Sequence, residues 1–303
     1  MADVSRMRIG GAVVFWRLAK STNRHVVAEG LKNLGMENHT PECRTPMACL
    51  RAALPEAYPS DNKETKHAIR PHKNGVPGFA VVAERPGDEL APGDEFGRVV
   101  AIAGMKENGE FVLKPSDHDR HNIIREAMQR ARDWVTSASV GKSLTGIIEY
   151  LAGVSLRPNG GVYWLNDWAL DEWAKVAEVF EAASAKTDAN NKPVEPNKIY
   201  VLSVKADEQM VRAVGDALTS EVEQELAAID EELKAGDLKP DACLRRVQRV
   251  GKIESKVMRY AGAFGVPMTK LTDATTAVAG HAAMAALQAS AAANPTPTFP
   301  TFS

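Results

Sequence analysis

The stretch from 159 to 260 constrains the fold most, because it contains strands and long amphipathic helices in an unambiguous order. A glycine-led apolar strand at 160–165 leads into a helix that Asn166 or Asp167 caps. A second β-branched strand follows at 198–204. Two strands joined through one helix favour parallel pairing with a right-handed crossover.

Two long helices of opposite charge come next. In both helices the apolar residues recur every three or four positions, and the segment 236–240 between them carries a turn signature. The first helix is acidic, and the second carries Arg245, Arg246, Arg249, Lys252, Lys256 and Arg259. This pattern predicts an antiparallel, coiled-coil-like helical hairpin with complementary charged flanks.

The N-terminal part of the chain has a different pattern. A strand at 8–18 precedes two short helices. The second is expected from Pro46 to Leu54, with Thr45 as its N-cap and Pro55 as the residue that stops it. Three strands are then expected, with a weaker fourth; their ranges are 78–84, 96–103, 110–114 and 66–70. The pair Asn108-Gly109 indicates a tight hairpin, since it tolerates positive φ angles. We predict a small antiparallel sheet with the two short helices on one face.

Together these elements define an α+β fold. We expect a small α+β domain, a helical segment with the strand–helix–strand unit, the helical hairpin, and an Ala-rich segment with a flexible tail. Their ranges are 1–115, 116–205, 206–262 and 263–303. In the helical segment, Ser116 or Asp117 caps a helix with apolar positions through Val135, and a further helix ends at Gly153.

Composition limits the class of protein. The chain has 303 residues and a formal net charge of -2, which argues against a protein that coats a polyanion over its whole surface. No apolar run approaches the roughly 18–20 residues that span a bilayer, and the N-terminus does not resemble a signal peptide. Three cysteines without a CxxC pair favour a reducing cytoplasmic location. We therefore expect a cytoplasmic protein without a membrane association.

The segment Ser139-Val140-Gly141-Lys142-Ser143 ends like a phosphate-binding loop. Such a loop needs a glycine five residues before Gly141, and Thr136 occupies that position. The segment also follows a helix rather than a strand. We interpret it as a turn between two helices, and we predict no cofactor.

His118 and His121 lie in a short cluster of metal-capable side chains. A metal site there would need distant carboxylates such as Glu126 or Asp133. The alternative is an ordinary helix start, where acidic residues offset the helix dipole. A metal-dependent hydrolase using these histidines is the weakest of three functional hypotheses.

Two basic segments suggest contact with nucleic acid. The first precedes Gly75 and contains Lys63, Lys66, Arg70 and Lys73. Lysine and arginine can neutralise phosphates, but no aromatic residue is interleaved for base stacking, and basic residues also protect sheet edges. The second segment is the basic helix, with Arg245, Arg246, Arg249, Lys252 and Lys256 as candidates. If the hairpin forms, its acidic helix neutralises much of that charge.

An aromatic cluster surrounds the start of the helix after 165. It contains Tyr163, Trp164, Trp168 and Trp173. Aromatic residues at this density can form a ligand pocket, but packing in the core explains them as well, and we favour the core. Cys43 and Cys49 have no base nearby that would support a nucleophilic role.

None of these patterns is a catalytic signature. The leading hypothesis is a non-catalytic binding or assembly protein that uses the charged hairpin and the tail to contact a protein partner or a second copy of itself. The alternative is a nucleic-acid-binding accessory protein.

Overall fold

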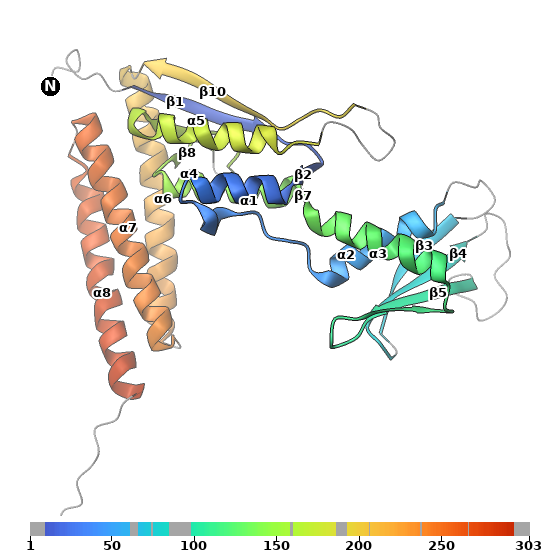
Figure 1. Ribbon diagram of the computed structural model, residues 1–303. Coiled ribbons are helices and arrows are strands. Elements are labelled where there is room, and N and C mark those ends of the chain that lie inside the picture. Colours follow the sequence, from blue (N-terminus) through green and yellow to red (C-terminus); the bar gives the residue numbers. More distant parts are fainter. Residues whose placement is uncertain are drawn as a thin grey trace, which may run out of the picture. The chain divides into compact units, whose positions relative to one another are not determined.

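The computed structural model describes residues 10–60, 66–73, 75–84, 98–157, 160–185, 193–205, 207–236, 238–265 and 267–293 (Figure 1). The fold is α+β, as predicted. The chain forms two compact units, each built from separate stretches of sequence. Residues 1–16, 146–174 and 199–303 form the bundle unit, and residues 17–145 and 175–198 form the N-terminal unit. The division into four consecutive segments at 1–115, 116–205, 206–262 and 263–303 stays a prediction.

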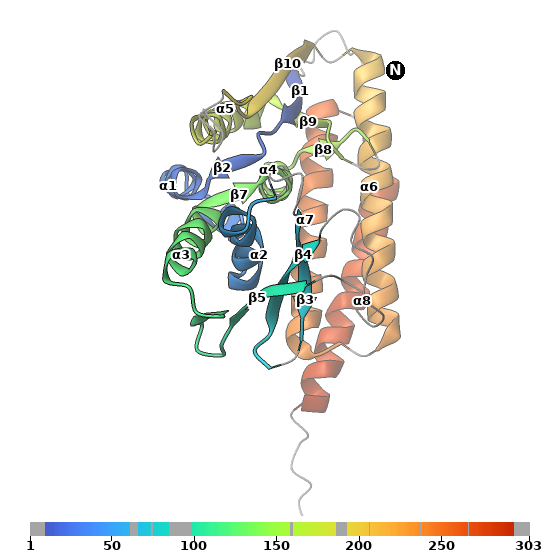
Figure 2. The same cartoon turned by 90° about the vertical axis from the view of Figure 1, so that its right-hand side faces the viewer.

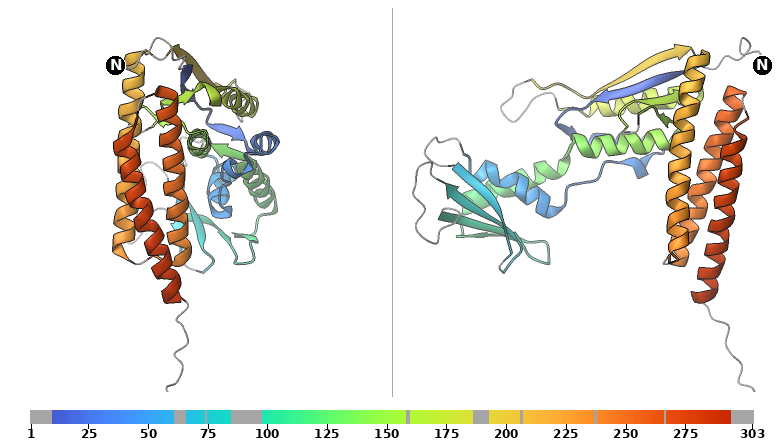
Figure 3. Two further views of the ribbon diagram at one scale, coloured as in Figure 1. Left: turned by 90° about the vertical axis from the view of Figure 1, so that its left-hand side faces the viewer. Right: turned by 180° about the vertical axis from the view of Figure 1, so that it is seen from behind.

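Three long helices dominate the bundle unit: α6 (Glu208–Ala235), α7 (Pro240–Phe264) and α8 (Thr269–Ala293). Figures 2 and 3 show them side by side. Gly236 ends α6 and Gly265 ends α7 in the left-handed conformation, with φ of 76° and 60°, which glycine adopts without a Cβ clash. The predicted hairpin of α6 and α7 is therefore present, and the Ala-rich segment adds a third helix to it.

The core of this bundle comes from the apolar stripes predicted by helical spacing. Val214, Leu218 and Val222 of α6 pack in one buried cluster with residues of α7 and α8. The charged flanks of α6 and α7 also meet as predicted. Ion pairs join Arg246 to Glu232, Arg249 to Glu225, and Lys256 to Glu221.

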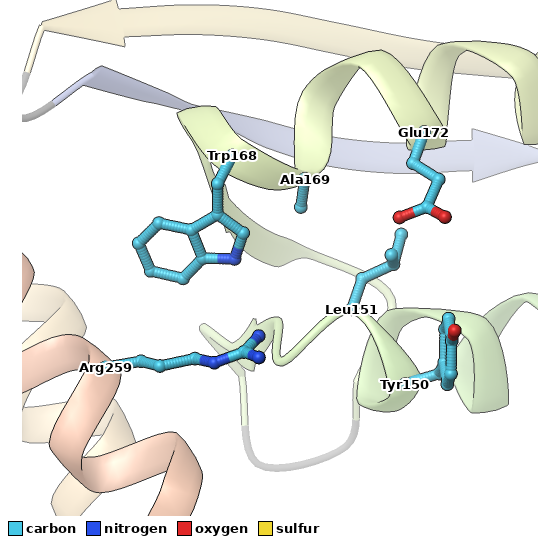
Figure 4. Close-up of a pocket in the computed structure, with 6 residues that line it drawn as sticks. All are labelled: Tyr150, Leu151, Trp168, Ala169, Glu172 and Arg259. Carbon is cyan, nitrogen blue, oxygen red and sulfur yellow. The ribbon is translucent and has the colours of Figure 1, made fainter.

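A four-stranded sheet completes the bundle unit, in the order β10-β1-β9-β8. These strands are β1 (Gly10–Arg17), β8 (Val154–Ser155), β9 (Tyr163–Asn166) and β10 (Lys198–Lys205). β1 pairs with β9 in antiparallel fashion, and the arrows of β1 and β10 point in opposite directions in Figure 4. The direct pairing expected between the strands at 160–165 and 198–204 is wrong, because β1 lies between them. They run in the same direction but do not pair with each other.

The N-terminal unit holds the second four-stranded sheet, in the order β3-β4-β5-β6. Its strands are β3 (Lys66–His72), β4 (Gly78–Glu84), β5 (Arg98–Met105) and β6 (Phe111–Lys114), and all neighbours are antiparallel. The predicted strand at 96–103 corresponds to β5, and residues 96 and 97 lie outside the described residues. β5 and β6 form the predicted hairpin, in which Gly109 has a φ of 80°. Asn108 does not have the positive φ that the predicted turn requires at both residues, so the turn differs from the one expected.

The remaining elements of the N-terminal unit are short. They are β2 (Ser21–Asn23), α1 (Arg24–Asn33), a 3-10 turn (Glu37–His39), α2 (Pro46–Ala57), α3 (His118–Asp133) and β7 (Trp134–Thr136). Buried residues of α2, α3 and the sheet share one core. α2 does not stop at Pro55 as predicted, because its last turn still closes through a hydrogen bond from the Tyr58 amide to the Leu54 carbonyl at 3.0 Å.

Two helices belong partly to each unit: α4 (Ser137–Tyr150) and α5 (Asp167–Ala182). The predicted turn at 139–143 is wrong, since this segment lies inside α4. The break comes earlier, at β7, where Val135 is buried and pairs with Thr22 of β2. Among the described helices, none has the length and apolar character that a membrane span requires.

Candidate functional site

The basic residues of α7 divide into two sets. Arg246, Arg249 and Lys256 form ion pairs with α6. The other set lies at seven-residue intervals, is exposed, and makes no ion pair with any described residue; it contains Arg245, Lys252 and Arg259. We call this set the α7 basic stripe. Seven helical residues rise about 10.5 Å, so the stripe extends along about 21 Å of the helix.

Lys256 links α7 to the chain that follows α4 and to α6 within the bundle unit. Its ammonium donates to the Gly153 carbonyl at 2.6 Å and to a Glu221 oxygen at 2.5 Å. The Tyr260 hydroxyl donates to the Ala152 carbonyl at 2.9 Å. Both carbonyls directly follow α4, where the helix dipole is negative, so α7 holds this end of α4 with a cation and a hydroxyl. Burial raises the pKa of the Tyr260 hydroxyl, so it stays a hydrogen-bond donor.

Trp168 extends from the first turn of α5 and is 46% exposed. Its ring meets the buried Tyr260 ring edge-on, with centroids 5.9 Å apart. The first turn of α5 closes tightly on β1, since a Cβ on Gly10 would lie 2.0 Å from an Asp167 oxygen. The indole is thus fixed along one edge by the core and open to solvent elsewhere.

Two shallow depressions flank Trp168. The first, of about 560 Å³, is lined by Trp168, Arg259, Gly262 and Ala263. A Cβ on Gly262 would meet no atom within 4 Å, so this side of the indole is unobstructed. The first depression therefore combines an open aromatic surface with one cation of the α7 basic stripe.

The second depression, of about 270 Å³, lies toward the ends of α4 and α5. Its lining residues are Tyr150, Leu151, Trp168, Ala169, Glu172 and Arg259. Figure 4 shows the Arg259 guanidinium below the indole and the Glu172 carboxylate across the depression from it. The side of Trp168 toward Glu172 is therefore of mixed charge, whereas on the side toward Gly262 the charged residue among the described lining residues is Arg259.

Carboxylates crowd together beside this region. Burial raises the pKa of Glu149 at the end of α4, and the nearby charges of Glu225 and Glu221 raise it further. Lys256 and Arg249 offset part of this shift. The hydrogen bond from Arg249 to Glu225 raises the pKa of the Arg249 guanidinium. This cation therefore stays charged and paired with Glu225 inside the bundle unit.

The basic run of the N-terminal unit is only partly placed. Lys63 lies outside the described residues, Lys66 begins β3, and Lys73 follows it. Lys66 and Lys73 are exposed, whereas Arg70 forms an ion pair with Glu84 of the neighbouring strand at 3.0 Å. Lys66 and Arg70 lie on β3, an edge strand of its sheet, the position where basic side chains also prevent edge-to-edge aggregation.

His118 and His121 lie in the first turn of α3. Asp117 caps this turn by accepting from the Arg120 amide at 3.0 Å. His118 contacts Asn122, and His121 stacks on Phe111 with centroids 4.6 Å apart. Within the described ranges, no three His, Cys, Asp or Glu side chains are grouped as metal ligands.

Trp168 is the residue that sequence reasoning misplaced. Trp164 and Trp173 are fully buried, as the core interpretation predicts, but Trp168 is not. A five-residue separation on a helix turns two side chains by about 140°, so Trp168 and Trp173 cannot share a face. This spacing is the signal in the sequence that could have shown that one of the two tryptophans is exposed. The proximity of Trp168 to Arg259 depends on tertiary packing and has no counterpart in the sequence.

Comparison with known proteins gives one relationship. The family of unknown function DUF6744 matches residues 9–293, so the chain belongs to this family. The searches of curated proteins and of solved structures found no match.

Proposed function

We propose that this chain is a non-catalytic binding protein that holds an acidic partner on the α7 basic stripe. The observation that carries the proposal is the division of charge along α7. Half of its basic side chains are neutralised by α6, while Arg245, Lys252 and Arg259 stay exposed on one face without a carboxylate partner among the described residues. A row of free cations on a rigid helix attracts and orients an anionic surface.

The end of the stripe has the composition of a binding hot spot. Tryptophan, tyrosine and arginine dominate such sites because they provide large contact areas and directional polar groups. Trp168, Tyr150 and Arg259 line the same depression. Both the charges and the aromatic rings are groups that recognise a partner, and this supports binding rather than catalysis.

The overall charge does not oppose this proposal. The chain has a formal net charge of -2, but the charges are unevenly distributed between the two helices: α6 has eight acidic and two basic residues, whereas α7 has six basic and two acidic residues. Binding at the stripe therefore depends on a local field, which salt screens over about 8–10 Å. Cys43, Cys49 and Cys243 are all free thiols, which suits the reducing cytoplasm that we also propose.

The proposal is tested by retention on immobilised heparin, a generic polyanion. Wild-type protein is expected to elute at a higher salt concentration than the Arg245→Gln/Lys252→Gln/Arg259→Gln variant. The matched control is Lys20→Gln/Lys32→Gln/Arg51→Gln, which removes the same charge from exposed positions of the N-terminal unit. The proposal is wrong if the two variants elute together, because retention would then follow net charge and not the stripe.

A further inference from the structure

We infer that the acidic partner is a single-stranded nucleic acid, with a base stacked on Trp168 and the phosphates following the α7 basic stripe. This inference rests on the proposed function and adds the chemical class of the partner. Sequence-tolerant binding of single strands combines a positively charged track with aromatic side chains on which bases stack. The structure brings these two parts together from α5 and α7.

Trp168 suits the stacking role. Contact with the Tyr260 ring holds the indole in place, and the Tyr260 hydroxyl is itself bonded to the Ala152 carbonyl. Stacking on a fixed ring loses little side-chain entropy when the base binds. The small residues Gly262 and Ala263 leave room for a flat ring in the first depression.

Arg259 connects the two parts of the surface, since it belongs to the stripe and also lines the first depression. A phosphate at Arg259 therefore lies next to a base at Trp168. The cations repeat every 10.5 Å or so along the helix, while phosphates of one strand repeat in shorter steps, about 3.4 Å in B-form DNA. A flexible strand can thus present one phosphate to each cation.

The charges around Trp168 also indicate on which side of the indole the strand lies. Glu172 lies on one side of the indole, in the second depression, and repels phosphate there. On the other side, the described residues that line the first depression include the cation Arg259 and no carboxylate. The strand is therefore expected to lie along α7 on the Gly262 side. A duplex keeps its bases stacked inside, so it cannot use the indole in this way.

The inference is tested by fluorescence anisotropy of the full chain with three labelled probes at low salt. The probes are the oligonucleotide dT20, an abasic strand with the same number of phosphates, and poly-L-glutamate. We expect wild-type protein to bind dT20 more tightly than the abasic strand. Trp168→Ala should weaken dT20 binding about 5- to 150-fold, the range for loss of one stacked base, and leave abasic binding unchanged.

Two further variants serve as controls for misfolding and for a nonspecific effect of changing α7. Trp168→Phe retains an aromatic face and should recover part of the dT20 affinity, so a loss caused by misfolding is recognisable. Met258→Ala changes an exposed side chain of α7 and should leave dT20 binding unchanged. If Trp168→Ala binds dT20 as wild type does, the inference is overturned.

The probes separate this inference from the proposed function. Equal binding of dT20 and the abasic strand, or tighter binding of poly-L-glutamate, would overturn the nucleic-acid inference and leave an acidic protein as the partner class. If none of the three probes binds at low salt, the inference and the proposed function both fail.

Discussion

At the scale of single residues, chemically identical side chains of α7 have opposite roles. Lys256 is 12% exposed and bonded to Gly153 and Glu221, whereas Lys252, one turn earlier, is exposed without an ion pair to any described residue. Burial and partner geometry, rather than residue type, decide which lysine stabilises the fold and which is available to a partner.

Replacing Lys256 should therefore destabilise the bundle unit. Lys256→Met leaves the Glu221 carboxylate and the Gly153 carbonyl without their cation, which is expected to lower the free energy of unfolding by about 2 kcal/mol. The same substitution at Lys252 is the control and should change it by less than about 0.5 kcal/mol. Urea unfolding followed by circular dichroism measures both. Equal effects of the two substitutions would show that the Lys256 contacts do not stabilise the fold.

Glu149 should make stability depend on pH. Its pKa is raised in the folded protein, first by burial and then by Glu225 and Glu221. A carboxyl with a raised pKa binds more protons when folded, so its unfavourable charge lowers stability as pH rises above the ordinary range of glutamate. Glu149→Gln should therefore stabilise the protein at pH 7, by less than about 1 kcal/mol because solvent screens this group.

The gain from Glu149→Gln should shrink toward pH 4, where the carboxyl is protonated in both states. Urea midpoints at pH 7 and pH 4 measure this difference. Glu223→Gln, an exposed change on α6, is the control and should show little gain at either pH. A gain from Glu149→Gln that grows as pH falls would contradict the assignment.

At the scale of elements, α8 is part of the folded bundle rather than an appended segment. Leu271 of α8 lies in the same buried cluster as the apolar stripes of α6 and α7. Asp230 of α6 also pairs with His281 of α8 at 3.0 Å, and hydrogen bonds from Lys234 and His281 lower the pKa of the Asp230 carboxyl. These contacts tie α8 to the predicted hairpin.

Leu271→Ala should consequently lower the free energy of unfolding by about 2–4 kcal/mol, the cost of deleting a buried leucine side chain. Met284→Ala removes an exposed side chain of the same helix and should have an effect below about 0.5 kcal/mol. Chemical denaturation of both variants provides the measurement. A neutral Leu271→Ala substitution would mean that α8 is not packed in the core.

Periodicity and turn residues predict the elements well. The α6 and α7 stripes, their ion-paired flanks and the Asn108-Gly109 hairpin all depend on local spacing, so the sequence specifies them. The place of β1 between β9 and β10 depends on long-range pairing, which local patterns do not encode. The exposure of Trp168 and its position beside Arg259 likewise depend on long-range packing. Of the candidate site, only the cations of α7 could therefore be predicted from the sequence.

At the scale of the molecule, the two units carry different basic surfaces. The N-terminal unit has Lys66 and Lys73 at a sheet edge, and the bundle unit has the α7 basic stripe with Trp168 at its end. Only the second combines free cations with an exposed aromatic ring among the described residues. The bundle unit is therefore the part of the protein to which we assign binding.

The most direct test of this account is the salt dependence of dT20 affinity. Each cation that neutralises a phosphate of a single strand contributes about -0.7 to the slope of log K against log salt concentration. The wild-type slope should therefore be steeper by about 2 units than that of Arg245→Gln/Lys252→Gln/Arg259→Gln. Lys20→Gln/Lys32→Gln/Arg51→Gln should keep the wild-type slope. Equal slopes for the stripe variant and the wild type would contradict the assignment of binding to α7.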